Sequence, residues 1–290
     1  MSNLINNIKN LRETTGAGFL DCKIALEKNN NEIEKSIDYL RKKGLAKATK
    51  KLLRTANEGA VGIFVNPDKT LLIEINTETD FAAKNDTFLN FFEKIGNFAL
   101  DINNNSEISN DDFMSYLFED LPISEHFTDI ISKIGENIVL NKINIIKIDS
   151  NTRIFSYTHN CYRKNIGKIC VALKVETNSQ SSELEQFGKN LCMHIAASKP
   201  LAIDIDNLDK EVVEKEKEIQ KEAIKSSGKP DNIVNKILDG KMNKFYSEVT
   251  LYNQNYVLDT EKTVKNIIDE FSANIDFKII NYSIFVLGNE

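Results

Sequence analysis

Apolar residues recur at helical spacing through the first 45 residues and are interrupted by turn-forming residues. The sequence TTGAGF breaks the first apolar stripe, and Asn29-Asn30-Asn31 is a predicted turn. Asp21 is a candidate N-cap for the second helix, and Gly44 is placed to end the third helix. We therefore expect three short helices whose small core is marginal alone but suits a docking module. Their apolar positions are Leu4, Ile5, Ile8, Leu11, Cys22, Ala25, Leu26, Ile33, Ile37 and Leu40.

A basic segment follows these helices. From Arg41 to Arg54 the chain has seven Lys or Arg residues and no acidic residue. One interpretation is a solvated linker helix between the predicted helices and the rest of the chain. The alternative is a tether that meets an acidic surface of a partner. The sequence leaves both interpretations open.

Two later segments share the order strand, turn and apolar-faced helix, and a further strand-like segment precedes each of them. This repetition predicts an α+β fold whose core holds two related subdomains, each an antiparallel sheet backed by helices. The first copy comprises 59–65 and 70–99, the second comprises 153–159 and 168–197, and Phe187 and Leu191 stand where the first copy has Phe88 and Phe92.

The composition changes in residues 207–246, which are dense in charge and carry a narrow apolar stripe on either side of a break, SSGKPD, at 226–231. This pattern predicts an antiparallel coiled-coil hairpin, called the arm below, inserted into the second subdomain. Strand-like segments return at 247–253, 255–259 and 277–288. The predicted domains are 1–54 (three-helix module with the basic linker), 55–146 (first subdomain), 147–206 with 247–290 (second subdomain) and 207–246 (arm).

The overall composition bounds the function. The chain has 290 residues, 41% of them hydrophobic, and a net charge of −6. This length and composition allow one large or two to three small domains with cores. Mild acidity weighs against a sequence-independent nucleic-acid binder, which needs surplus Lys and Arg. The longest apolar runs are far shorter than the roughly 18 residues of a membrane span. We expect neither direct nucleic-acid binding nor a membrane association.

Chemistry-bearing motifs are sparse. The four cysteines form no C-x-x-C pair and the three histidines are scattered, so we expect no metal site and reduced thiols in a cytoplasmic protein. Phosphate-loop, dinucleotide-binding, hydrolase and zinc-protease signatures are missing, and we expect no cofactor and no enzymatic activity. His194 lies on an apolar helix face and is interpreted as a packed core residue. The chain is typical of a protein that acts on a partner.

The sequence around Phe81 does not fit a simple turn. A strand-like run ends near Ile75, and an aromatic helical stripe begins at Phe88. Between them, Thr79-Asp80-Phe81 places a large aromatic where glycine, serine or asparagine is usual. One interpretation is a core residue or hydrophobic staple with Asp80 as the N-cap. The other is an aromatic that contacts a partner.

Three stretches resemble landmarks of one family, the bacterial translation elongation factors Ts. They are LRETTGAGFLDCKIAL at 11–26, EINTETDFAAKN at 74–85 and MHIAASKP at 193–200, with GENI and EVVEKE…SGKP…KF as further matches in the same order. Two positions depart from the family pattern: Ile24 replaces a basic residue and Ala82 replaces the usual valine. The chain also ends at Glu290, without the additional C-terminal helix of some members.

The resemblance implies a guanine nucleotide exchange factor that binds the GTPase elongation factor Tu in its GDP form. It implies that the three-helix module is similar to a ubiquitin-associated domain and docks on the GTPase. It also implies that Thr79, Asp80, Phe81 and Ala82 dislocate the Mg²⁺ of the partner GTPase. The arm then either contacts the partner or mediates self-association. The partner-binding residues implied by the resemblance are Leu11, Arg12, Thr15, Gly16, Gly18, Phe19, Asp21 and His159.

Overall fold

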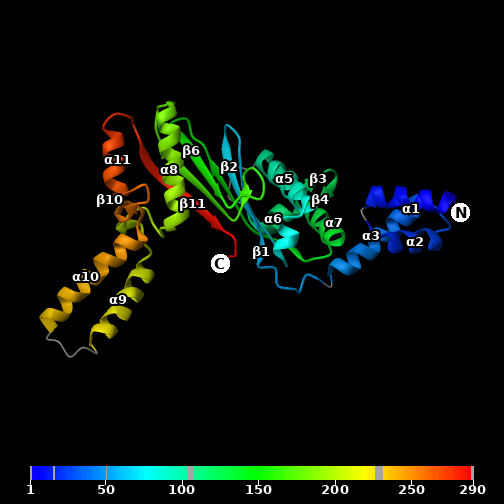
Figure 1. The fold of residues 1–290 in the computed structure, drawn as a ribbon, viewed down its shortest axis with the longest axis horizontal. Helices are drawn as coiled ribbons and strands as arrows, with labels where there is room; N and C mark the ends of the chain where they lie inside the picture. Colours follow the sequence, from blue (N-terminus) through cyan, green and yellow to red (C-terminus); the bar gives the residue numbers. More distant parts are fainter. Residues whose placement is uncertain (1, 16, 50, 103–107, 226–230, 289–290) are drawn as a thin grey trace. The chain divides into compact units, whose positions relative to one another are not determined.

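A computed structural model of the protein describes residues 2–15, 17–49, 51–102, 108–225 and 231–288 (Figure 1). Within this part of the chain, two compact units are present. The first unit comprises Met1–Lys147, Asn160–Cys170 and Phe285–Glu290, and the second comprises Ile148–His159 and Val171–Ile284. Helices and antiparallel sheets both contribute, so the predicted α+β class is confirmed.

The chain begins with the predicted helices of the three-helix module, α1 (Ser2–Thr15), α2 (Phe19–Lys28) and α3 (Ile33–Thr49). The turn between α2 and α3 is confirmed, with Asn30 and Asn31 both in the left-handed region. Asparagine tolerates that conformation better than other non-glycine residues. Their shared core contains Ile8, Leu11, Cys22, Ala25, Leu26 and Leu40, as the apolar periodicity predicts.

Two predicted helix boundaries in this module are wrong. Gly18, not Asp21, is the N-cap of α2, and Asp21 lies inside its first turn, where an acidic side chain favours the helix dipole. Gly44 does not end α3, which continues to Thr49. A Cβ at Gly44 would lie 2.6 Å from Ser132 Oγ of α7 (Ile123–Ile134), so the glycine permits close packing of two helices.

Contact between α3 and α7 changes the interpretation of the basic segment. Arg41 forms an ion pair with Glu125 of α7, next to the Gly44 contact. The helical part of the basic segment ends at Thr49, and Lys51–Leu53 form a turn. The three-helix module is therefore packed on α7 rather than isolated by a solvated linker.

The first unit contains the sheet whose strand β2 leads to Thr79, Asp80 and Phe81. Its strands are β1 (Glu58–Val65), β2 (Lys69–Thr77), β5 (Ile138–Lys147) and β7 (Ile166–Gly167). In the described residues the order is β5-β2-β1-β7, and neighbouring strands are antiparallel. Strand β2 is central and buried almost throughout, which fits its apolar sequence TLLIEI.

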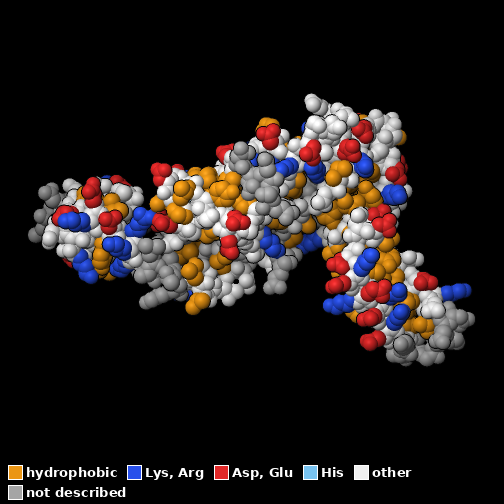
Figure 2. Space-filling model, turned by 180° about the vertical axis from the view of Figure 1, so that it is seen from behind, with side chains coloured by type: hydrophobic (Ala, Val, Ile, Leu, Met, Phe, Trp, Pro, Cys, Tyr) orange, Lys and Arg blue, Asp and Glu red, His pale blue; other side chains and the backbone are white. Residues whose placement is uncertain are grey.

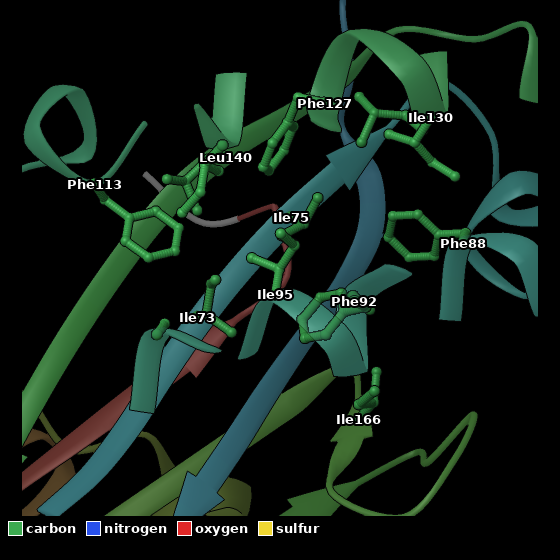
Figure 3. Packing of buried hydrophobic residues seen from close by; sticks show 14 of the residues in the cluster. Ile73, Ile75, Phe88, Phe92, Ile95, Phe113, Phe127, Ile130, Leu140 and Ile166 are labelled. Carbon is green, nitrogen blue, oxygen red and sulfur yellow. The ribbon is translucent and has the colours of Figure 1, made fainter. Parts of the chain in front are cut away.

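Helices α5 (Asp86–Asp101) and α7 supply aromatic residues to the core beside β2 (Figure 3). Phe88 and Phe92, one helical turn apart, pack edge to face with ring centroids 5.9 Å apart. Both side chains are fully buried, in agreement with the apolar stripe of this helix. Three elements between α5 and β5 are not foreseen by the sequence pattern: α6 (Asn110–Ser115), β3 (Leu117–Phe118) and β4 (Leu121–Pro122).

Replacing Phe88 with alanine should lower the free energy of unfolding by about 3 to 5 kcal/mol, because the substitution leaves a cavity in a fully buried cluster. Denaturant titration of both proteins measures this difference. Leu117→Ala is the control, since Leu117 is exposed and should change stability by less than about 0.5 kcal/mol. Equal effects of the two substitutions would contradict the burial assigned to Phe88.

The second copy of the strand–turn–helix order lies mainly in the second unit. The described strands β6 (Thr152–His159), β8 (Ile169–Glu176) and β11 (Lys278–Val286) are ordered β11-β8-β6. Helix α8 (Ser182–Ser198) follows β8 as α5 follows β2, and Ser181 caps it. His194 of α8 is fully buried and bonds to Gln254 through Nε2 at 2.9 Å, which confirms its interpretation as a packed core residue. Burial lowers the pKa of His194, against the opposing effect of Gln254.

The region after the arm differs from the sequence expectation. Residues 247–253 are not a strand, because α10 (Asp231–Val249) continues through Val249 and a 3₁₀ turn follows at Leu251–Asn253. A two-strand hairpin of β9 (Asn255–Tyr256) and β10 (Asp259–Thr263) comes next. Helix α11 (Val264–Ser272) was not predicted, although Thr263 and Asn266 form a capping box at its start. The strand expected within 277–288 is confirmed as β11.

The arm consists of α9 (Lys210–Lys225) and α10, which lie side by side in Figure 1. A narrow core of Ile224, Leu238 and Met242 joins them. Leu238 and Met242 belong to the apolar stripe that the sequence predicts for α10, but the stripe predicted for α9, of Val212, Ile219 and Ala223, is wrong because these side chains are exposed. Acidic and basic side chains are intermixed on its surface (Figure 2). Residues 226–230 of the predicted break at 226–231 lie outside the described residues, and Asp231 begins α10. Across the described helices, none combines the length and the apolar character needed to cross a membrane.

Candidate protein-interaction site at the corner after strand β2

The corner (Thr79–Ala82) begins where β2 ends and is built on one turn of helix, α4 (Asp80–Ala83). Thr79 is the N-cap in an extended conformation, and its Oγ1 accepts a hydrogen bond from the Ala82 N–H at 3.2 Å. Thr77 Oγ1 donates to the Thr79 carbonyl at 2.8 Å. Local hydrogen bonds therefore fix the backbone on both sides of Asp80 and Phe81.

Phe81 is directed into solvent at this corner. Its side chain is 83% exposed, whereas Ala82 and Ala83 on the same helical turn are 5% and 0% exposed. The two alanines anchor the turn against the sheet, and the aromatic side chain contributes no core packing. The interpretation of Phe81 as a core residue or staple is wrong. An exposed aromatic on a fixed backbone is typical of a contact surface.

Asp80 is not the helix cap, which corrects the sequence interpretation. It occupies the first helical position, and its carboxylate bonds to Lys84 Nζ at 2.8 Å, one turn further along. That hydrogen bond lowers the pKa of Asp80, against the opposing effect of desolvation. The positive charges of Lys84 and Lys168 act in the same direction as the hydrogen bond. Asp80 is therefore ionised at neutral pH and presents an acceptor beside Phe81.

A residue that sequence reasoning missed supports the corner from another element. Glu136 follows α7 and contacts Thr79 with both carboxylate oxygens: Oε1 accepts the Thr79 hydroxyl at 2.8 Å and Oε2 accepts the Thr79 N–H at 3.0 Å. The GENI motif contained a signal of family resemblance at this position. Nothing in its local pattern indicated the contact, because the two residues are 57 positions apart.

The predicted docking residues of the three-helix module fall into three environments. Arg12 and Phe19 border a shallow hollow that Ile5, Ile8 and Ala17 also line, and Phe19 is 52% exposed. Thr15, Gly18 and Asp21 line a second hollow, toward α7. In that hollow Asp21 bonds to Lys43 at 2.8 Å, which raises the pKa of Lys43. Leu11 is fully buried in the module core, and Gly16 lies outside the described residues.

His159 ends strand β6 of the second unit, and its side chain is exposed. Its Nδ1 lies 3.1 Å from the hydroxyl of Tyr157 on the same strand. This contact orients the imidazole ring. Elsewhere in the described chain, no group of three or more His, Cys, Asp or Glu residues has the arrangement of a metal site.

Comparison with known proteins places this site in a family. The sequence model described as "Elongation factor TS" matches residues 78–289, which include the corner and the arm. A protein of Sinorhizobium fredii named "Elongation factor Ts" is 39% identical over 268 residues, covering 92% of this chain and 86% of the relative. Its namesake in Ehrlichia ruminantium is 37% identical over 290 residues, covering 98% of both chains. The namesake in Gluconobacter oxydans is 35% identical over 285 residues. The chain belongs to the elongation factor Ts family.

Proposed function

We propose that this chain is a guanine nucleotide exchange factor that binds elongation factor Tu in its GDP form, dislocates Mg²⁺ and promotes GDP release. Family membership supports the general role. The exposure of Phe81, at 83% on a corner with a fixed backbone, is the observation that carries the mechanism. The chain would act by binding alone, in the cytoplasm, and would make or break no covalent bond.

Phe81 would act as a wedge. A GTPase holds GDP through backbone amides and through Mg²⁺, which demands near-ideal octahedral contacts to oxygen. An aromatic side chain that enters between partner elements displaces them by a discrete step, because packed interfaces switch between arrangements. Asp80 would accept hydrogen bonds from the partner, and Thr79 and Ala82 would hold the turn that presents Asp80 and Phe81. Each tenfold increase in the rate of GDP release requires about 1.4 kcal/mol.

Docking would be a separate task, assigned to the three-helix module (residues 1–54). The hollow beside Arg12 and Phe19 combines apolar surface with the charges of Arg12 and of the Lys9–Glu13 ion pair, so it suits an amphipathic partner helix whose rim offers an acidic side chain to Arg12. Thr15, Gly16, Gly18 and Asp21 would also contact the partner, and Leu11 would support the module from its core. His159, in the subdomain 147–206 with 247–290, would add a second contact. Exchange is assigned to the subdomain 55–146, and the arm to partner contact or self-association.

Stopped-flow release of a fluorescent GDP analogue from the cognate elongation factor Tu tests this proposal. We expect the release rate to rise with the concentration of this chain and to reach a plateau. A release rate that is the same with and without the chain would overturn the proposed function.

An adaptor that binds the GTPase without exchanging its nucleotide is the rival function. Thermodynamic linkage distinguishes the two functions. If the chain weakens the binding of GDP to the GTPase by some factor, bound GDP must weaken the binding of the chain to the GTPase by the same factor. We expect calorimetry to show markedly tighter binding to nucleotide-free than to GDP-bound elongation factor Tu. Equal affinity for the two forms would favour the adaptor.

A further inference from the structure

We propose that Glu136 is a positioning residue for nucleotide exchange, holding Phe81 in place through Thr79. This inference rests on the proposed function, since it assigns a role within the same site. Glu136 itself lies outside the exposed surface formed by Asp80 and Phe81. It would act by fixing the backbone from which Phe81 projects.

The contact geometry supports this role. Each carboxylate oxygen of Glu136 accepts one hydrogen bond from Thr79, at 2.8 Å from its hydroxyl and at 3.0 Å from its N–H. The same Thr79 oxygen accepts the Ala82 N–H at 3.2 Å. A continuous chain of hydrogen bonds therefore runs from Glu136 through Thr79 to Ala82 and restrains the backbone on both sides of Phe81. Bonds to an ionised carboxylate are stronger than bonds between neutral groups.

Glu136 is itself held at both neighbours. Gly135 ends α7 with φ of +90°, a left-handed conformation that favours glycine, and its N–H bonds to the Ile131 carbonyl at 2.9 Å. Asn137 is 1% exposed and donates its N–H to Glu78 at 2.6 Å and its side-chain amide to the Arg54 carbonyl at 2.7 Å. The backbone on both sides of Glu136 is thus fixed by contacts that do not involve Thr79.

The corner needs such support because its own structure is short. A single helical turn of four residues is unstable alone. Ala82 and Ala83 bury little area, and the ring of Phe81 packs against nothing that would restrain it. An error of about 1 Å in placing a functional group can lower a rate by about a hundredfold. The Glu136–Thr79 bonds supply restraint from outside the corner.

The test compares Glu136→Ala and Glu136→Gln with the wild type. For each full-length protein, stopped-flow experiments measure the plateau rate of GDP release and the half-saturating concentration. Hydrogen exchange at the Ala82 amide and the melting temperature are measured on the same proteins. We expect Glu136→Ala to lower the plateau rate about tenfold with a half-saturating concentration within about twofold of wild type, because docking lies elsewhere. Exchange of the Ala82 amide should become faster. Glu136→Gln should retain most of the rate, since its amide bonds to both Thr79 groups.

Glu119→Ala is the matched control, because Glu119 pairs with Lys94 at 2.7 Å on the same unit and does not contact the corner. This control should keep the wild-type plateau rate and Ala82 protection. A wild-type plateau rate in Glu136→Ala would overturn the positioning role. So would a loss that merely follows the folded fraction, or an equal loss in Glu136→Gln. Unchanged protection of the Ala82 amide in Glu136→Ala would overturn the positioning role, whatever the rate of GDP release. Failure of the wild-type chain to release GDP is a separate result, and it would reject the proposed function.

Discussion

Replacing Phe81 with alanine should lower the plateau rate of GDP release by about 30-fold, corresponding to about 2 kcal/mol for one buried aromatic anchor. The free energy of unfolding should stay within about 0.5 kcal/mol of wild type, because the side chain is 83% exposed and supports no core. Stopped-flow release at saturating concentration gives the rate, and denaturant titration gives the stability.

The expected split between rate and affinity makes this prediction specific. Docking through the three-helix module is intact in Phe81→Ala, so the half-saturating concentration should change less than the plateau rate. Phe88→Ala is the matched control on the neighbouring helix: it should lose stability, and its plateau rate per folded molecule should stay near wild type. A plateau rate of GDP release in Phe81→Ala equal to that of the wild type would reject the role of Phe81 as a wedge.

The opposite split is expected for Phe19→Ala. Phe19 is 52% exposed and borders the apolar hollow of the three-helix module, where it would bury its ring against the partner. Truncation should raise the dissociation constant for elongation factor Tu about 30-fold, again about 2 kcal/mol, because the interface loses an aromatic anchor. The plateau rate at saturation should be unchanged. Calorimetry measures the affinity, and the stopped-flow assay measures the plateau.

Leu117→Ala is the control for Phe19→Ala, since Leu117 is an exposed apolar residue on β3, outside the module. It should bind with wild-type affinity. If Phe19→Ala also bound with wild-type affinity, docking through this hollow would be rejected. A lower plateau rate with unchanged affinity would instead assign Phe19 to exchange.

Local periodicity predicted the strand before the corner and the aromatic helix after it, because both have one strongly apolar face. It did not distinguish Thr79 from Asp80 as the cap, since both residue types cap helices and they are adjacent. The predicted helix end at Gly44 is wrong for a related reason. Glycine suits both a helix end and a close contact between helices, and only the packing against α7 distinguishes the two. Local sequence leaves such choices to tertiary contacts.

Local sequence patterns also do not predict which side chains are exposed or which distant segments are in contact. The strand expected at 247–253 is wrong because so short a run of mixed polar and apolar residues also fits the end of a helix, and α10 continues to Val249. Whether Phe81 faces core or solvent depends on the buried alanines beside it. The partnership of Thr79 with Glu136 joins segments 57 positions apart and required the folded chain.

Chelation of the metal tests whether Phe81 accelerates GDP release by displacing Mg²⁺. GDP release would be measured at saturating concentrations of wild type and of Phe81→Ala, first in millimolar Mg²⁺ and then with excess chelator. The wild-type to variant ratio should be about 30 in Mg²⁺ and fall toward one in chelator, because no metal then remains to be displaced. A ratio that is the same in both buffers would contradict the displacement of Mg²⁺ by Phe81.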